Sequence, residues 1–407
     1  MNRPFILAST LGIYTAVRML IGVYHAIFLL STGVTLAQLA LLQLVFSVVM
    51  LLFNFPCAVI ADKYSHKYSV IIGVFFTAIF YLFSLQAPDM YFLVIAQIFY
   101  SIGLGLCATA INGWLYYSLE DKKDSFSQYA HLSHRVGSLG SVFTGMIGIA
   151  TIYFSGSFFV GYIISAIAMV MIIFILIWVP EKKIVQQSEV KPATLIQNTY
   201  ETLWIFKNTL GGKYYIIQAC LLTAGLQVVL HFWQPIILNN ERINYFDNYN
   251  LLVLMLCHVG AFSSQYFSNF ILSKYHLADN KYKNYIKYFS FFSGGMCIAL
   301  LLLVNVNYIY LAIIAFSLIH GFICTVPIGA QSLFLSELKQ GQETHVSSIA
   351  GAIAFSGRIF SILVLSVISF LPENLPPVYY LVLPAITFAL CGFIMIKWMS
   401  QVKKLQC

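Results

Sequence analysis

Long apolar runs, each able to cross a lipid bilayer as a helix, follow one another along almost the whole chain. A membrane-spanning helix needs about 20 apolar residues. The runs cover residues 5–30, 36–60, 70–87, 91–118, 128–154, 157–179, 214–238, 249–272, 285–304, 308–335, 346–371 and 378–399. We therefore predict an all-α polytopic membrane protein with 12 transmembrane helices.

A long polar segment divides these runs into six and six. It suggests an N-terminal six-helix bundle at 1–179, a cytoplasmic linker at 180–213 and a C-terminal six-helix bundle at 214–407 with a short cytoplasmic tail. A weak repeat supports the division, because Ser133-His134-Arg135-Val136-Gly137-Ser138 is similar to Ser356-Gly357-Arg358-Ile359-Phe360-Ser361, six spans later. Such duplication predicts two pseudo-symmetric bundles around a central cavity, with a transport site near mid-membrane.

The positions of lysine and arginine predict the orientation. Of the 22 such residues, 19 lie in or beside one set of loops, and the opposite loops hold only Arg242. Cytoplasmic loops carry an excess of these residues. We therefore expect both termini in the cytoplasm and place the protein in a bacterial cytoplasmic membrane.

Composition agrees with a membrane location and adds a constraint. Hydrophobic residues make up 60% of the chain, charged residues 9%, and the mean hydropathy is +0.84. All 14 acidic residues fall at or beyond the ends of the apolar runs, whereas Arg18 and Arg358 lie within them. A membrane interior with cations but no carboxylates limits both the coupling ion and the charge of the cargo.

The loop after the second apolar run carries a charged motif. It reads Ala58-Val59-Ile60-Ala61-Asp62-Lys63-Tyr64-Ser65-His66-Lys67. This resembles the G-x-x-x-D-R-x-G-R-K loop of the major facilitator superfamily, in which Asp62 and Lys67 match and Lys63 stands where the family has Arg. The resemblance implies that Asp62 caps a neighbouring helix and, with Lys63 and Lys67, holds the cytoplasmic side closed. A carboxylate near a helix N-terminus is stabilising; the alternative for Asp62 is a solvated loop charge.

Two further segments are similar to bacterial drug-efflux members of that family. Residues 112–120, which end the fourth run, are similar in sequence to the same segment of those members. The acidic residue that those members commonly have near Asn112 is absent here. The fifth run contains Gly137, Gly140, Gly145 and Gly148 but lacks the Gly-Pro pair of proton-coupled exporters. Small residues also let membrane helices approach closely, so packing is the alternative interpretation. The resemblance implies export.

Arg18 is the first candidate for substrate binding. It lies about 20 Å along the first run by helix rise, near the bilayer midplane. A lone charge there is costly and is expected to face a cavity or a partner. His25 follows seven residues later on nearly the same face. The alternative for Arg18 is a structural role, bonded to backbone groups.

The seventh run carries a polar stripe. Gln227, His231 and Gln234 are spaced i, i+4 and i+7, and Pro235 follows. We expect this stripe to face Arg18 across the cavity; interhelical hydrogen bonding is the alternative. Four other positions receive roles: Asn112 and His320 as further cavity residues, Arg135 and Arg358 as gate or structural residues. His258 is expected to be a packed histidine.

These observations favour a secondary active transporter that moves a small amphipathic molecule by alternating access. Arg18 favours an anionic cargo. Histidine is the side chain left to carry a coupled proton, because its unperturbed pKa suits that task. Proton-coupled efflux of a drug-like molecule is the first prediction. The alternatives are an importer or exchanger of an anionic metabolite or a siderophore-like metal chelate, and a lipid flippase.

Several other classes are disfavoured. The eight cysteines form no C-x-x-C, and neither G-x-S-G nor H-E-x-x-H occurs. We therefore expect no enzyme activity, no bound metal and no cofactor other than a proton gradient. The expected partners are a small-molecule substrate and the lipid bilayer, without nucleic acid, and the chain is expected to act as a monomer.

Overall fold

The protein is an α-helical bundle in a computed structural model. The model describes residues 3–119, 122–181, 204, 206–209, 211–238, 247–275, 280–336, 346–371 and 375–406. The first half contains α1 (Arg3–Gly22), α2 (His25–Ser31), α3 (Leu36–Lys63), α4 (His66–Ser84), α5 (Met90–Ser118), α6 (Lys122–Ser155) and α7 (Phe159–Trp178). The second half contains α9 (Gly212–His231), α10 (Trp233–Leu238), α11 (Asn248–Ser273), α12 (Asn280–Asn305), α13 (Ile309–Ser336), α14 (Val346–Ser369), η2 (Pro377–Leu381) and α15 (Val382–Gln406).

Eleven helical segments in the described residues are long and apolar enough to cross a membrane. The remaining predicted span corresponds to α14, whose described apolar part is Phe355–Ser369. The all-helical membrane architecture is therefore confirmed, while the twelfth span and the pseudo-symmetry of the halves stay predictions. Most of the predicted linker, residues 182–203, 205 and 210, lies outside the described residues.

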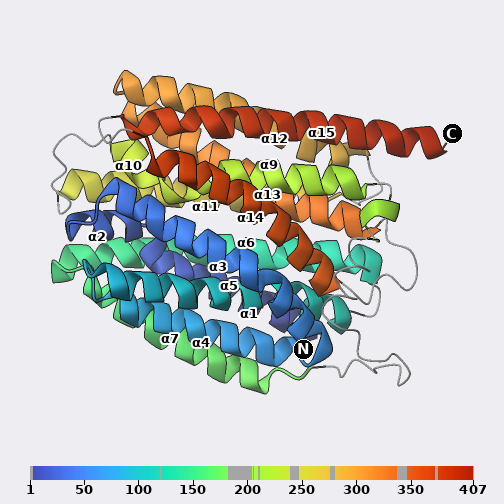
Figure 1. The fold of residues 1–407 in the computed structure, drawn as a ribbon, viewed down its shortest axis with the longest axis horizontal. Coiled ribbons are helices and arrows are strands. Elements are labelled where there is room, and N and C mark those ends of the chain that lie inside the picture. The colour runs from blue at the N-terminus through green and yellow to red at the C-terminus, as the bar shows by residue number, and fades with distance from the viewer. Residues whose placement is uncertain are drawn as a thin grey trace.

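The bundle is elongated, and its long helices run roughly side by side (Figure 1). α1 begins and α15 ends toward the right of the view, whereas α2 and α10 lie at the left. We call the right-hand end, where α3 ends at Lys63 and α6 begins at Lys122, the Lys-rich end. The opposite end is the short-loop end.

The closest contacts between the halves are those of α3 with α14 and of α6 with α11. Within the first half, α6 also packs closely against α1. A Cβ atom at Gly140 would lie 2.6 Å from the Ala16 Cβ, and one at Gly148 would lie 2.1 Å from the Leu20 carbonyl oxygen. The glycines of the fifth span thus allow close helix packing, which explains them without an export motif.

The first helix of each half is interrupted near the short-loop end. α1 stops at Gly22 and α2 resumes at His25, while α9 and α10 are separated by Phe232. A break frees backbone groups that need other partners. Here the side chain of Gln234 supplies them: Ile27 N donates to its Oε1 at 3.1 Å, and its Nε2 donates to the Gly22 carbonyl at 2.9 Å. Discontinuous helices of this kind line binding sites in transporters.

The acidic side chains in the described residues lie at helix ends, as predicted. Asp89 caps α5 by accepting a hydrogen bond from Tyr91 N, and Asp247 caps α11 through Tyr249 N. Asp62 lies in the last turn of α3, and Glu181 follows α7. The membrane-spanning middle of these helices therefore contains no described carboxylate.

Candidate functional site

A cavity of about 380 Å³ lies between the two halves. Helices α1 to α6 border it from the first half, and α9, α10, α11 and α13 from the second. Ligand pockets in proteins commonly have volumes of about 300–1,000 Å³, so this cavity lies near the lower end of that range. We call this space the central cavity.

The polar lining of the central cavity is basic or neutral. Among the described residues that line it, none is Asp or Glu. Six carry a guanidinium or imidazole: Arg18, His25, His134, His231, His258 and His320. The lining therefore favours negative charge in the space that it surrounds.

Arg18 lies on the cavity wall beside two tyrosines. Its Nη2 donates to the Tyr100 hydroxyl at 2.7 Å, and its Cζ lies 5.6 Å from the centre of the Tyr14 ring. Its Nε has no hydrogen-bond partner among the described residues. The tyrosines hold the guanidinium in place on the cavity wall, where its charge can attract an anion.

The cavity histidines differ in how many of their ring nitrogens are occupied. His25 Nδ1 is hydrogen-bonded to the Tyr162 hydroxyl at 2.6 Å. His258 Nε2 lies 3.0 Å from the Ser141 carbonyl, so His258 is the packed histidine that the sequence predicted, although it also borders the cavity. His320 packs against Phe262 with ring centres 4.9 Å apart, and its buried Nδ1 has no partner among the described residues.

The polar stripe of the seventh span does not lie on one face as expected. The interruption at Phe232 separates Gln234 from the helix that carries Gln227 and His231. His231 and Gln234 border the cavity, but Gln227 does not; its Nε2 donates to Ser47 Oγ at 3.5 Å. Gln227 therefore forms the interhelical contact that was the alternative interpretation.

Arg18, His25, His231, Gln234 and His320 come together around one cavity, and their role in substrate binding stays a prediction. The side chain of Asn112 lies outside the described residues. Sequence reasoning missed eight lining residues with a hydroxyl, amide or imidazole group: Thr15, Gln43, Tyr81, Gln97, Tyr100, His134, Ser138 and Gln265.

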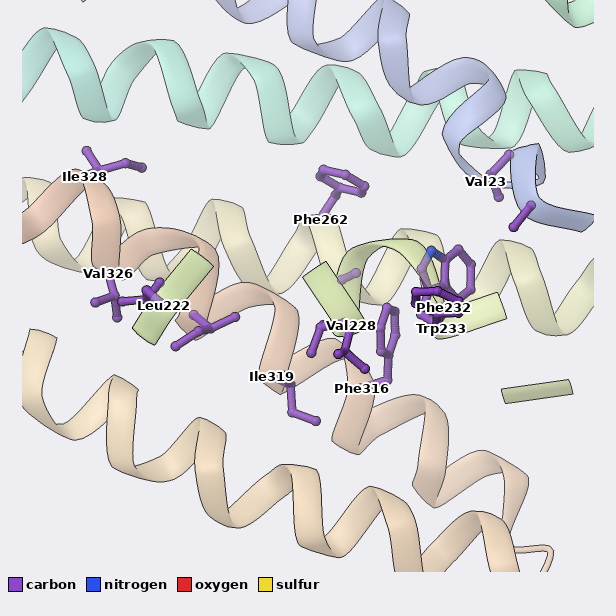
Figure 2. Packing of buried hydrophobic residues seen from close by; sticks show 14 of the residues in the cluster. Val23, Leu222, Val228, Phe232, Trp233, Phe262, Phe316, Ile319, Val326 and Ile328 are labelled. Carbon is purple, nitrogen blue, oxygen red and sulfur yellow. The ribbon is translucent and has the colours of Figure 1, made fainter. Parts of the chain in front are cut away.

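A cluster of aromatic rings completes the lining. Phe80 stacks on Tyr100 in the first half with ring centres 4.4 Å apart. In the second half, Trp233 stacks on Phe316 at 5.1 Å, beside Phe262. Figure 2 shows Trp233 and Phe316 beside the interruption between α9 and α10, with Phe262 on the neighbouring helix. The cavity thus offers flat apolar surfaces as well as hydrogen-bonding groups.

Hydrogen bonds join the halves on both sides of the cavity. At the short-loop end, Gln234 bonds to Gly22 and Ile27. Toward the Lys-rich end, the buried His131 of α6 bonds through Nδ1 to Asn269 Oδ1 at 2.9 Å and through Nε2 to the Tyr282 hydroxyl at 3.1 Å. This conformation therefore has inter-half contacts at both ends.

The two predicted gate arginines contact aromatic rings of the opposite half. Arg135 lies 5.8 Å from the Phe270 ring centre, and Arg358 lies 4.9 Å from that of Phe46. Neither borders the central cavity. Their positions between the halves agree with a gate or structural role, which stays a prediction.

The motif loop is joined to the end of α7 by Glu181. Its Oε1 accepts hydrogen bonds from His66 N at 2.8 Å and Lys67 N at 3.2 Å, so this carboxylate caps α4. Burial opposes ionisation of Glu181, but the hydrogen bonds from His66, Ser65 and the backbone outweigh it and hold the pKa below its usual value.

The three predicted gate residues of that loop make other contacts. Asp62 Oδ1 lies 3.1 Å from His66 Nε2, Lys67 Nζ donates to the Ile177 carbonyl at 2.6 Å, and Lys63 lies over the Tyr64 ring. Residues 337–345, before α14, lie outside the described residues. The gating role of Asp62, Lys63 and Lys67 therefore stays a prediction.

A sequence model of the major facilitator superfamily matches residues 6–363. The chain belongs to the major facilitator superfamily. No curated protein matches the sequence significantly.

Solved transporter structures share the fold of this superfamily member. The Escherichia coli fucose:proton symporter FucP has a TM-score of 0.70 and 14% identity, covering 98% of this chain and 99% of that one. The nucleoside transporter NupG has a TM-score of 0.67 and 15% identity, covering 97% and 99% of the two chains. At this identity the similarity shows the fold alone.

As a superfamily member, the protein is a membrane transporter, and its cavity chemistry bears on what it can hold. Within the described ranges, no three His, Cys, Asp or Glu side chains come together as a metal site, although five histidines border the cavity. The guanidinium of Arg18, on the cavity wall, can bind a carboxylate or phosphate. The aromatic surfaces can hold an apolar body.

Proposed function

We propose that this protein is a proton-coupled secondary transporter of a small amphipathic anion, which it exports by alternating access. One observation carries the proposal: in the part of the chain that the structure describes, the central cavity is bordered by Arg18 and five histidines and by no carboxylate. An anion binds in such a cavity without a competing negative charge. Its apolar part packs on rings such as Trp233 and Phe262.

Histidine is the proposed proton carrier, since its unperturbed pKa places its charge change near physiological pH. His25, His231 and His320 all border the cavity, where a proton and an anion can influence each other's binding. The fold of FucP, a fucose:proton symporter, shows that this architecture serves proton coupling in another protein.

The proposed direction rests on the similarity of residues 112–120 to drug-efflux members, because packing alone accounts for the glycines of α6. The excess of Lys and Arg at the Lys-rich end supports cytoplasmic termini in a bacterial membrane. Import of an anionic metabolite or a siderophore-like chelate is the second candidate, favoured by the proton symporter among the similar structures.

A growth-inhibition panel tests the proposal. Cells with and without the protein are exposed to matched anionic, neutral and cationic amphipathic inhibitors, with and without a proton ionophore. We expect protection against anionic compounds alone, lost with the ionophore. Protection against cations only would contradict the anionic cargo, and protection that survives the ionophore would contradict proton coupling. We expect the inhibitor against which the protein protects to accumulate in inverted vesicles. Accumulation in right-side-out vesicles would contradict export and indicate import.

A further inference from the structure

The side chain of His131 joins the first half to two helices of the second. His131 lies on α6, and its Nδ1 is hydrogen-bonded to Asn269 Oδ1 of α11 at 2.9 Å, while its Nε2 is hydrogen-bonded to the Tyr282 hydroxyl of α12 at 3.1 Å. All three residues are 0% exposed. Both bonds cross between the halves, so the halves cannot separate at this point without breaking them.

This His131 cluster, formed by His131, Asn269 and Tyr282, lies between the central cavity and the Lys-rich end. α6 begins at that end, and His131 is nearer to its beginning than His134, which borders the cavity. α11 runs antiparallel to α6, because His258 is hydrogen-bonded to the Ser141 carbonyl whereas Asn269 is hydrogen-bonded to His131. Alternating access moves the halves against each other, so the cluster must separate when the cavity opens to the Lys-rich end.

Hydrogen bonds within the second half hold the Asn269 side chain in position. Its Nδ2 donates to the Gln265 carbonyl at 2.9 Å and to Thr325 Oγ1 at 3.3 Å. Thr325 Oγ1 in turn donates to the Gly321 carbonyl at 2.8 Å. Both amide hydrogens of Asn269 are therefore used, and its Oδ1 is the acceptor that faces His131. None of these three bonds crosses between the halves, so they can persist when the halves separate.

The acceptor role of Asn269 Oδ1 determines how the His131 ring is used. Nδ1 carries the hydrogen that it donates to Oδ1, so in the neutral ring Nε2 accepts from the Tyr282 hydroxyl. The ring therefore makes one bond as a donor and one as an acceptor. Such a contact holds buried helices together without an ion pair.

We infer that His131 closes the central cavity toward the Lys-rich end, and that its two hydrogen bonds break each time the cavity opens there. His131 is the first-half partner in both bonds, so one side chain holds both α11 and α12. The inference rests on the alternating access of the proposed function, but not on its cargo, its coupled ion or its direction.

The native thiol of Cys324 can report the opening. Cys324 borders the cavity, and the other described cysteines are buried. The experiment measures its rate of reaction with a membrane-impermeant methanethiosulfonate in sealed right-side-out and inverted vesicles. Cys407 is replaced by serine in every variant, and Cys324→Ser is the blank. A tag after α15, which ends at the Lys-rich end, shows which vesicles present that end outward (Figure 1).

The variants remove the bonds one at a time. Tyr282→Phe keeps the ring but loses one bond, so labelling through the Lys-rich end should be about fivefold faster, the value of one hydrogen bond. His131→Phe loses both bonds and should give about twentyfold, whereas His131→Gln, whose amide can still donate and accept, should stay within about threefold of the wild type. Tyr215→Phe is the matched control and should label at the wild-type rate. Tyr215 is buried against Phe334 and Trp398 of its own half and does not border the cavity.

Two outcomes would overturn the inference. One is wild-type labelling in both Tyr282→Phe and His131→Phe, and the other is an equal acceleration through the short-loop end, which would indicate general loosening. If His131→Phe does not fold, Tyr282→Phe alone decides. The growth-inhibition panel is independent: its failure would remove the anionic cargo or the proton and leave this closure, whereas unchanged labelling would leave a transporter that other contacts close.

Discussion

The side chain of Gln234 holds the interrupted first helix of the opposite half by its backbone. Its Nε2 donates to the Gly22 carbonyl at 2.9 Å, just before the interruption, and its Oε1 accepts from Ile27 N at 3.1 Å, just after it. One amide thus satisfies a freed acceptor and a freed donor. Because Gln234 also borders the cavity, the contact that closes the short-loop end is adjacent to the proposed binding site.

Gln234→Leu should open the short-loop end more often. The substitution leaves Gly22 O and Ile27 N unpaired, at a cost of about 1–3 kcal/mol for a buried group. Hydrogen–deuterium exchange should show at least tenfold faster exchange in α2 and α10. Gln218→Leu is the control, because both amide atoms of Gln218 already lack partners among the described residues. Unchanged exchange in Gln234→Leu would show that the amide does not hold this end closed.

Arg18→Lys should reduce transport at least tenfold, and Arg18→Ala should abolish it, with insertion and folding retained. Lysine cannot both keep the bond to Tyr100 and present a second planar N–H donor to an anion, since its ammonium is a point charge. Transport of the compound against which the wild type protects best provides the measurement. Gln218→Leu is the control and should keep most activity, because Gln218 is buried within the second half and does not border the cavity. Wild-type transport by well-expressed Arg18→Ala would remove Arg18 from the site.

Gly145→Ala should destabilise the α6–α11 contact between the halves. A Cβ atom there would lie 2.1 Å from His258 Cδ2, and overpacking of this kind costs about 1–3 kcal/mol. Thermal unfolding in detergent should show a lower midpoint. The control is Gly295→Ala, whose Cβ would meet nothing within 4 Å and whose helix gains about 1 kcal/mol of propensity. A midpoint for Gly145→Ala at or above that of the wild type would contradict this packing.

The length and polarity of the apolar runs were sufficient to predict the helical membrane fold, since spanning helices need continuous apolar segments. The positions of the interruptions were not predictable in the same way. The interruption of the second half at Phe232 is the exception, because Pro235 lacks the N–H that would bond to the His231 carbonyl and its ring disrupts the preceding turn. The interruption of the first half, between Gly22 and His25, has no proline beside it. Contacts from other helices, such as those of Gln234 with Gly22 and Ile27, stabilise the freed groups, and a single segment does not reveal such contacts.

The site was partly predictable for a related reason. Depth along a span identified Arg18 and His25, because depth depends only on residue count. Orientation around the helix axis depends on packing, and it turns Gln227 toward Ser47 instead of the cavity. His134 was missed because its neighbour Arg135 was assigned to the cytoplasmic end, whereas α6 begins at Lys122 and places His134 three turns inside the helix, exposed to the cavity.

The cap formed by Glu181 should make stability depend on pH in the acidic range. The folded-state pKa of Glu181 lies below its unfolded value, so its stabilising contribution is present above the unfolded value, about 4.3, and is lost as pH falls through the folded pKa. Removing a helix cap costs about 1 kcal/mol. Thermal unfolding from pH 3.5 to 7 should show Glu181→Gln less stable than the wild type above about pH 5, with the difference shrinking toward pH 3.5. Ser65→Ala, which removes one donor to the carboxylate, should give a smaller pH-dependent loss. Parallel wild-type and Glu181→Gln curves across this range would show that the Glu181 charge does not stabilise the start of α4.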